Sequence, residues 1–308
     1  MPPLLHRYFR GLVAGLAALA GATGPALAKA GPSSGSPFTF ALLVPSLSQP
    51  GLLALKSGAQ KAGHRLDIHI LTQNAHYSAW TQSEQMNAMI AQRADMLLID
   101  PVDPQELQPE LHKAKKAGIP VVMLNRTASP FKPIAFLHYD FKLAGRKVCT
   151  KLATRLGGSG TVTILTTDKP DWTSQQAAEG CASALAATSG IKEVRWHGPG
   201  GRSGGRQAMR KLLGQPSAQA ALFAPSGPMA IGAARLLRQE HRSNVAIGTV
   251  CGGTSEERSA IDQEPVAFTV LLPGRPMGEQ AVDLGFRYLV RNRARQVEQL
   301  PLHVKRSH

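Results

Sequence analysis

Side chains that could hold a small molecule follow several of the strands that the sequence predicts. Asn125 and Arg126 come directly after one apolar run, Asp100 follows another, and Trp172 lies in a short polar loop after a third. The Arg126 guanidinium is a rigid fork of donors that suits paired oxygens or a carboxylate, and the flat Trp172 indole can stack on a ring. Structural roles stay open for both, as a loop cap for Arg126 and as a cover of a hinge for Trp172.

The sequence does not contain the residue patterns of covalent or metal-assisted catalysis. Its three cysteines, Cys149, Cys181 and Cys251, form no CxxC motif, and the ten histidines show no metal-ligand spacing. The sequence around Cys251 shows no pattern of a nucleophile with a general base beside it. We therefore expect no enzyme activity, no metal and no cofactor.

Length and composition indicate a globular protein of two domains. The chain has 308 residues, of which 43% are hydrophobic and 18% are charged. This composition excludes a disordered chain, a collagen and a protein with several membrane spans. The formal net charge of +15 suits an anionic partner, but the Lys and Arg residues are scattered, which favours an ordinary basic surface.

Residues 1–28 have the organisation of a secretory signal peptide. A short basic segment, His6–Arg10, precedes an apolar stretch, and Ala26-Leu27-Ala28 is a small-x-small cleavage pattern. An uncleaved membrane anchor is the alternative, although the apolar stretch is short for a membrane span. We expect cleavage after Ala28, a tether over residues 29–37 and a soluble protein in the periplasm.

Strands and helices alternate along the rest of the chain. Strands are predicted over residues 38–46, 64–72, 96–99, 120–124, 134–139, 161–167, 191–197, 220–224, 245–250, 266–272 and 297–304, and helices over 51–63, 82–92, 104–117, 141–156, 174–187, 206–213, 228–239 and 275–290. This pattern is typical of parallel sheets covered by helices, and it runs twice, so we expect two similar lobes. Residues that follow the strands would face a cleft between the lobes, which is a preferred place for a small ligand.

Several segments resemble the ribose-binding group of the type I periplasmic binding proteins. They are Leu55–Lys61, Leu98–Asp103, Gly118–Arg126, Tyr139–Gly145, Ala178–Gly180 and Met229–Ala233. The resemblance covers nearly the whole chain after the signal peptide. It depends on the order and spacing of the segments rather than on any single motif.

The resemblance implies an α/β fold with two Rossmann-like lobes joined by a three-crossing hinge. The crossings are expected near Tyr139, Leu272–Gly274 and Leu300. The N-terminal lobe would then comprise residues 38–138 plus 273–300, and the C-terminal lobe residues 139–272 plus 301–308. Related cytoplasmic repressors carry an N-terminal helix-turn-helix where this chain has the signal peptide, so we expect no nucleic-acid partner.

The resemblance also implies positions for ligand contacts. Where this chain has Asn125-Arg126, the family has an acidic residue and an arginine that hold sugar hydroxyls. Asp100 matches a position that sometimes contacts ligand, and it could equally cap the helix near Pro104. Asp140 matches an acid at the crossing between lobes, where a role in the hinge alone is the alternative. Gln49 is a further polar candidate.

Other matched positions differ from the sugar-binding pattern. The family's second-lobe arginine falls on Ala177 beside Gln176, a polar position becomes Ser226, and an acid aligns near Cys251. Buried sugar hydroxyls would lack partners at such positions. The sequence therefore predicts weak binding of free pentoses and hexoses and favours an anionic or weakly polar organic solute.

Cys149 and Cys181 lie on predicted helices that could be neighbours on one face of the C-terminal lobe. A disulfide between them is one hypothesis, and two small buried side chains are the other. Cys251 would remain a lone thiol near the cleft.

The function that the resemblance implies is a monomeric periplasmic solute-binding protein. It would capture a small organic or sugar-like ligand between its lobes and deliver it to the membrane permease of an ABC importer. The alternative is a sensor subunit that reports its ligand to a two-component histidine kinase or a chemoreceptor. The replaced pocket residues favour the sensor somewhat, because sensor relatives often abandon the sugar contacts.

Overall fold

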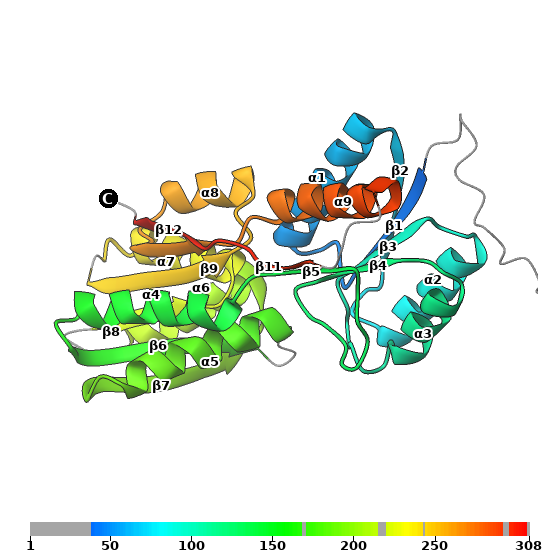
Figure 1. The fold of residues 1–308 in the computed structure, drawn as a ribbon. Helices are drawn as coiled ribbons and strands as arrows, with labels where there is room; N and C mark the ends of the chain where they lie inside the picture. Colours follow the sequence, from blue (N-terminus) through cyan, green and yellow to red (C-terminus); the bar gives the residue numbers. More distant parts are fainter. Residues whose placement is uncertain (1–37, 168–170, 215–219, 243, 292–295, 307–308) are drawn as a thin grey trace, which may run out of the picture. The chain divides into compact units, whose positions relative to one another are not determined.

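The computed structural model describes residues 38–167, 171–214, 220–242, 244–291 and 296–306, which form two six-stranded sheets with helices on both faces (Figure 1). The predicted signal peptide and tether lie outside these residues. Within the described part of the chain, no helix is both long and apolar enough to span a membrane. The fold agrees with the expected pair of α/β lobes.

The first sheet has the order β11-β5-β4-β3-β1-β2, and its strands are parallel. They are β1 (Phe38–Val44), β2 (Ile68–Asn74), β3 (Met96–Ile99), β4 (Val121–Leu124), β5 (Ala135–His138) and β11 (Gln296–Gln299). Helices α1 (Pro50–Leu66) and α9 (Gly274–Arg291) cover one face, and α2 (Ala79–Ala91) and α3 (Gln108–Lys116) cover the other (Figure 1). Successive strand residues point to opposite faces, so Phe40 and Leu42 join one apolar cluster while Ala41 and Leu43 join another.

The second sheet has the order β12-β10-β9-β8-β6-β7, and among its described strands only β12 runs antiparallel to its neighbour. Its strands are β6 (Ser159–Thr167), β7 (Gly190–Gly198), β8 (Ala220–Ala224), β9 (Val245–Cys251), β10 (Phe268–Leu271) and β12 (His303–Arg306). The helices of this lobe are α4 (Phe141–Arg155), α5 (Trp172–Ala186), α6 (Gly201–Leu213), α7 (Gly227–Gln239) and α8 (Ser255–Asp262). Buried side chains of α4 and α5 share one apolar cluster, and those of α6 and α7 share another, so the two helix pairs cover opposite faces of the sheet.

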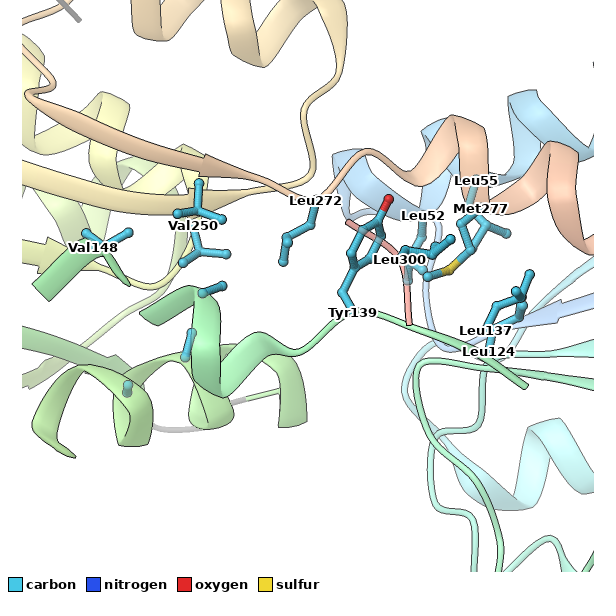
Figure 2. Packing of buried hydrophobic residues seen from close by; sticks show 14 of the residues in the cluster. Leu52, Leu55, Leu124, Leu137, Tyr139, Val148, Val250, Leu272, Met277 and Leu300 are labelled. Atoms are coloured by element: carbon cyan, nitrogen blue, oxygen red, sulfur yellow. The ribbon is translucent and has the colours of Figure 1, made fainter. Parts of the chain in front are cut away.

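Three connections cross from one sheet to the other: β5 to α4, β10 to α9, and β11 to β12. The Tyr139 hydroxyl donates a hydrogen bond of 2.9 Å to the carbonyl oxygen of Pro273, which ties the first crossing to the second. Tyr139, Leu272 and Leu300 belong to one buried cluster that also contains Leu52 and Val148 (Figure 2). The hinge is therefore packed with apolar side chains rather than being a loose linker.

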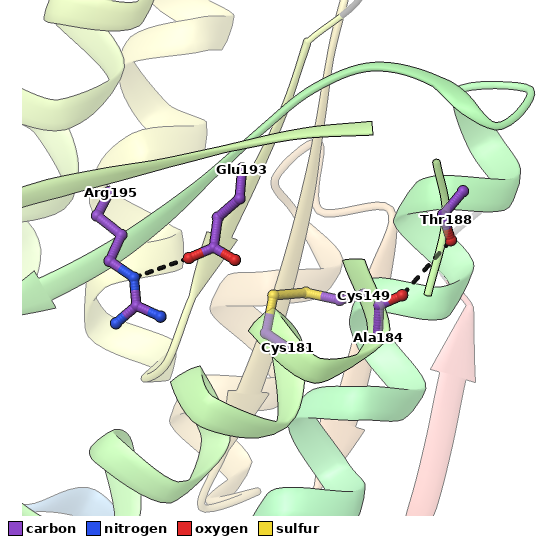
Figure 3. The surroundings of a disulfide bond; sticks show 6 residues. All are labelled: Cys149, Cys181, Ala184, Thr188, Glu193 and Arg195. Atoms are coloured by element: carbon purple, nitrogen blue, oxygen red, sulfur yellow. Dashed lines mark hydrogen bonds and ion pairs between the residues drawn. A yellow bond between two sulfur atoms is a disulfide. The ribbon is translucent and has the colours of Figure 1, made fainter. Parts of the chain in front are cut away.

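Helices α4 and α5 pack at very short range because each has a glycine at the contact. A Cβ on Gly145 would lie 1.8 Å from the carbonyl oxygen of Ala177, and one on Gly180 would lie 1.8 Å from that of Lys142. Cys149, one turn after Gly145, forms a disulfide with Cys181, which directly follows Gly180, and the Cα–Cα distance is 5.0 Å (Figure 3). The remaining cysteine, Cys251, is buried and free.

Some predicted boundaries are wrong for local reasons. The strand predicted over residues 297–304 is two strands in different sheets, because the third crossing interrupts it at Leu300–Leu302. Helix α1 extends through Leu66 and ends where Asp67 adopts a left-handed conformation, so the next strand begins four residues later than predicted. Helix α3 begins at Gln108 instead of residue 104. Helix α8 was not predicted.

Candidate functional site

The candidate site lies at the carboxyl ends of the strands of both sheets. The neighbours β1 and β3, and likewise β6 and β8, are the strands at which the chain order in each sheet reverses, and ligands of open parallel sheets bind there. A cavity of about 780 Å³, here called the cleft cavity, is lined from both lobes. Its polar and aromatic lining includes Gln49, Tyr77, Asp100, Asn125, Arg126, Asp171, Trp172, Ser226, Cys251 and Glu257.

Asp100 and Asn125 form a buried pair in this cavity. The Asn125 side-chain nitrogen donates a hydrogen bond of 2.7 Å to Asp100 Oδ2, and Asn125 has a φ of 55°, which asparagine tolerates better than most residues. Burial raises the pKa of the Asp100 carboxyl to about 7, against the lowering effects of Asn125 and Arg126. Asn125 Oδ1 is buried without a hydrogen-bond donor among the described residues.

Gln82 fixes the loop that carries Asp100. This fully buried side chain donates to the Asp100 carbonyl oxygen at 2.9 Å and accepts from the Val102 backbone nitrogen at 2.8 Å. Asp100 does not cap a helix, since the Asp103 carboxylate instead accepts from the backbone nitrogens of Gln105 and Glu106. The alternative capping role of Asp100 is therefore wrong.

Arg126 and Trp172 come from opposite lobes and meet in the cavity. The Arg126 guanidinium carbon lies 5.1 Å from the centroid of the Trp172 ring, and Nη1 donates a hydrogen bond of 2.7 Å to the Val102 carbonyl oxygen. Desolvation lowers the Arg126 pKa, and the nearby Asp103 and Asp100 oppose that shift. Arg126 Nε and Nη2 make no hydrogen bond to the described residues, so they can serve a ligand.

Trp172 is positioned by the N-terminus of α5. Asp171 caps this helix, since its carboxylate accepts from the Ser174 backbone nitrogen at 3.0 Å and from the Ser174 hydroxyl at 2.8 Å. Phe141 packs edge-on against the Trp172 ring, with centroids 5.8 Å apart. The indole is therefore held between Phe141 and Arg126.

The C-terminal lobe contributes a corner made by Ser226, Cys251 and Glu257. Burial and the Glu257 carboxylate raise the pKa of the Cys251 thiol to about 12, so the thiol is neutral and unreactive. Burial also raises the Glu257 pKa. Glu257 forms a capping box with Thr254 at the start of α8.

Gln49 and Tyr77 line the cleft cavity from the N-terminal lobe. The Gln49 side-chain nitrogen donates to the Tyr77 hydroxyl, and Tyr77 is held at a φ of 62°. Desolvation and the charge of Asp171 raise the Tyr77 pKa, so the phenol remains protonated and can donate as well as accept.

Asp140 and Gln176 line a different cavity. Asp140 caps α4, since its carboxylate accepts from the Leu143 backbone nitrogen at 2.7 Å. Both residues border a second cavity of about 510 Å³, here called the hinge-side cavity, which also has Asn125, Arg126 and Trp172 in its wall. The other seven residues named from the sequence line the cleft cavity.

Sequence reasoning missed Glu257, Asp171 and Tyr77. A signal for Glu257 was present, because Thr254 followed three residues later by glutamate is the pattern of a capping box and predicts a helix start. Asp171 directly precedes Trp172 at a helix start, where aspartate is a preferred cap. No sequence pattern indicated Tyr77, because the path of the β2–α2 loop alone brings this residue to the cavity.

The charge of the cleft cavity differs from the sequence-based expectation. Among the described residues that line it, three carry carboxyl groups, namely Asp100, Asp171 and Glu257. One, Arg126, carries a cationic group. An excess of carboxyl groups disfavours an anionic solute. The Tyr77 hydroxyl and the carboxyl groups of Asp171 and Glu257, which the sequence did not indicate, also supply hydrogen-bond partners in the cavity. The reason to expect weak binding of polyhydroxylated solutes is therefore removed. Within the described ranges, no group of three or more His, Cys, Asp and Glu residues could hold a metal ion.

Comparison with known proteins identifies relatives across most of the chain. A family model described as "Periplasmic binding protein domain" matches residues 40–293. The ribose import binding protein RbsB of Escherichia coli is 26% identical over 252 residues, which cover 82% of this chain and 84% of that protein. The protein of the same name from Bacillus subtilis is 24% identical over 256 residues, which cover 80% of each chain.

Solved structures share the fold. A periplasmic solute-binding protein from Actinobacillus succinogenes with bound D-allose has a TM-score of 0.78 and 22% identity, covering 87% of this chain and 97% of that one. The periplasmic component of the arabinose ABC transporter from Shewanella has a TM-score of 0.74 and 21% identity, covering 86% and 91%. At these identities the likeness establishes the architecture alone.

Proposed function

The chain belongs to the periplasmic binding protein family, and on that premise we propose that it captures a neutral, sugar-like solute in the cleft cavity for an ABC importer. The observation that carries the proposal is the meeting of Arg126 and Trp172 from opposite lobes inside one cavity. A ligand held by both lobes binds most tightly when the lobes close on it, and a permease can recognise this closed conformation.

The lining of the cleft cavity suits a polyhydroxylated ring. Arg126 offers donors, Asp100 and Glu257 offer oxygen atoms, and the Trp172 indole presents a flat apolar face. Sugar rings have both apolar faces and a rim of hydroxyl groups. Import is preferred to sensing because the matched relatives are named as import proteins.

The proposal also covers the bounds of the lobes, the oligomeric state, the partners and the cellular location. The lobes comprise residues 38–138 plus 273–300 and residues 139–272 plus 301–308, and the protein acts as a monomer with a small-molecule ligand and a membrane permease as partners. No nucleic acid takes part. The relatives support a periplasmic location, to which residues 1–28 would direct the chain as a signal peptide.

Replacing Arg126 by alanine should weaken ligand binding by about 10- to 150-fold, because a hydrogen bond to a charged group contributes roughly 1.5–3 kcal/mol. Calorimetric titration with ribose, allose, arabinose, glucose and galactose tests both the proposed function and this residue. Arg155→Ala is the control, since Arg155 is exposed at the end of α4 and lines neither cavity. Binding of none of these monosaccharides, and of no disaccharide either, would refute the proposed ligand class. Equal affinity of the two variants would refute the role of Arg126.

Export should remove residues 1–28, so the mature protein should begin at Lys29. The basic segment, the apolar stretch and the small residues at positions 26 and 28 are the features that a signal peptidase requires. N-terminal sequencing of the protein from the periplasmic fraction measures this directly. A protein that keeps Met1, or that stays in the cytoplasm, would contradict the assignment.

A further inference from the structure

The hinge-side cavity adjoins the cleft cavity, and the two share a wall. Asn125, Arg126, Tyr139, Phe141 and Trp172 line both of them. The volumes of about 510 and 780 Å³ each fall within the range of roughly 300–1,000 Å³ that is usual for ligand sites. One cavity is assigned to the solute by the proposed function, and the other has no role in it.

The lining of the hinge-side cavity has the chemistry that a sugar ring needs. Phe136 and His138 are stacked at 4.8 Å between ring centroids with an interplanar angle of 11°, and Phe141 and Trp172 add two more rings. Polar groups stand among these aromatic rings, namely Asp103, Gln105, Asp140, Lys142 and Gln176. Flat apolar faces beside hydrogen-bonding groups suit a ring that is apolar on its faces and polar on its rim.

The partition between the two cavities includes a contact that can open. Arg126 and Trp172 belong to different lobes and are held together by a cation–π contact, with the guanidinium carbon 5.1 Å from the ring centroid. Rotation of one lobe about the hinge would separate them. A glycosidic linkage could then pass between two rings, one in each cavity.

We propose that the hinge-side cavity is a second subsite, which binds the second ring of a disaccharide whose first ring occupies the cleft cavity. The inference rests on the proposed function, because it assumes a sugar in the cleft cavity. It names the solute class more narrowly: two linked sugar rings rather than one.

The test compares disaccharides with their component monosaccharides by calorimetric titration of the full mature protein. The probes are maltose, cellobiose, lactose and melibiose beside glucose and galactose. We expect at least one disaccharide to bind about 10-fold more tightly than either component, as one added aromatic contact provides. Gln176→Trp should fill the hinge-side cavity and reduce this ratio toward 1. Gln175→Trp is the matched control, because Gln175 is exposed on the same helix, also bonds Glu179 and lines neither cavity.

The possible outcomes separate the second subsite from the proposed function. A disaccharide preference that Gln176→Trp abolishes and Gln175→Trp preserves supports the second subsite. Binding of monosaccharides with no preference for any disaccharide overturns the subsite and leaves the proposed function intact, as does a preference that both variants reduce equally. Binding of neither class in the wild-type protein overturns the subsite and the proposed function together.

Discussion

Replacing Asp100 by asparagine should stabilise the ligand-free protein at pH 8 by up to about 4 kcal/mol, because it removes a carboxylate that is buried in the native state. Burial raises the Asp100 pKa from its ordinary value of 3.8 to about 7. Asparagine cannot ionise, and its amide can face Asn125 Oδ1, which is buried without a donor among the described residues. Urea unfolding at pH 5 and pH 8 measures the effect.

The direction of the pH dependence follows from the raised pKa. Below pH 4 Asp100 is protonated in both the folded and the unfolded chain, and its contribution to stability is fully present. Between pH 4 and pH 7 the folded chain keeps a proton that the unfolded chain releases, so stability falls as the pH rises. Above pH 7 the carboxylate remains buried, facing Arg126, which opposes the penalty, and Asp171, which adds to it.

The control for this prediction is Glu106→Gln, which removes an equal charge from an exposed loop position. It should leave the difference in stability between pH 5 and pH 8 close to that of the wild-type protein, whereas Asp100→Asn should reduce the difference. A lower stability of Asp100→Asn at pH 8 would show that the carboxylate is stabilised by partners and would contradict the raised pKa.

Removing the disulfide between α4 and α5 should lower the free energy of unfolding by about 3–4 kcal/mol. The bridge closes a loop with a sequence separation of 32 residues, and the entropy that such a loop removes from the unfolded chain gives this magnitude. The double variant Cys149→Ala/Cys181→Ala, compared with the wild-type protein in urea without reductant, measures it.

Reductant provides the matched control. It should destabilise the wild-type protein and leave the double variant unchanged, because Cys251 is the remaining cysteine and is free. Thiol titration of the unreduced, denatured wild-type protein should find one thiol. Three thiols would show that the bridge does not form in the exported protein.

The local sequence was sufficient to predict the sheets and the positions where their strands end. Apolar runs such as Met96–Ile99 and Val121–Leu124 are buried over their whole length, and the polar residues that follow them reach the cleft cavity. The reason is geometric, because parallel strands bring their carboxyl ends to one edge of a sheet. Asp100, Asn125 and Arg126 are therefore identifiable as candidate ligand contacts from the amino-acid sequence alone.

Boundaries between elements were harder to predict where a distant partner decides them. Residues 297–304 form a continuous β-rich segment, yet β11 pairs with β5 in one sheet and β12 with β10 in the other. A short segment carries no information about which sheet each half joins. Helix α8 could have been predicted from its capping box, but its short length gives too few apolar positions for a helical period.

What the sequence by itself determined is the two-lobed α/β fold and the cluster of polar residues at its strand ends, because both follow from the local period of apolar side chains. Only the tertiary structure decided the charge balance of the cleft cavity and which residues line each of the two cavities. Glu257 and Asp171 change the charge of the cleft cavity, and Asp140 and Gln176 lie in the hinge-side cavity instead. Charge balance and cavity walls depend on side chains that are far apart in the chain, as Arg126 and Trp172 are, and their meeting is set by how the lobes pack.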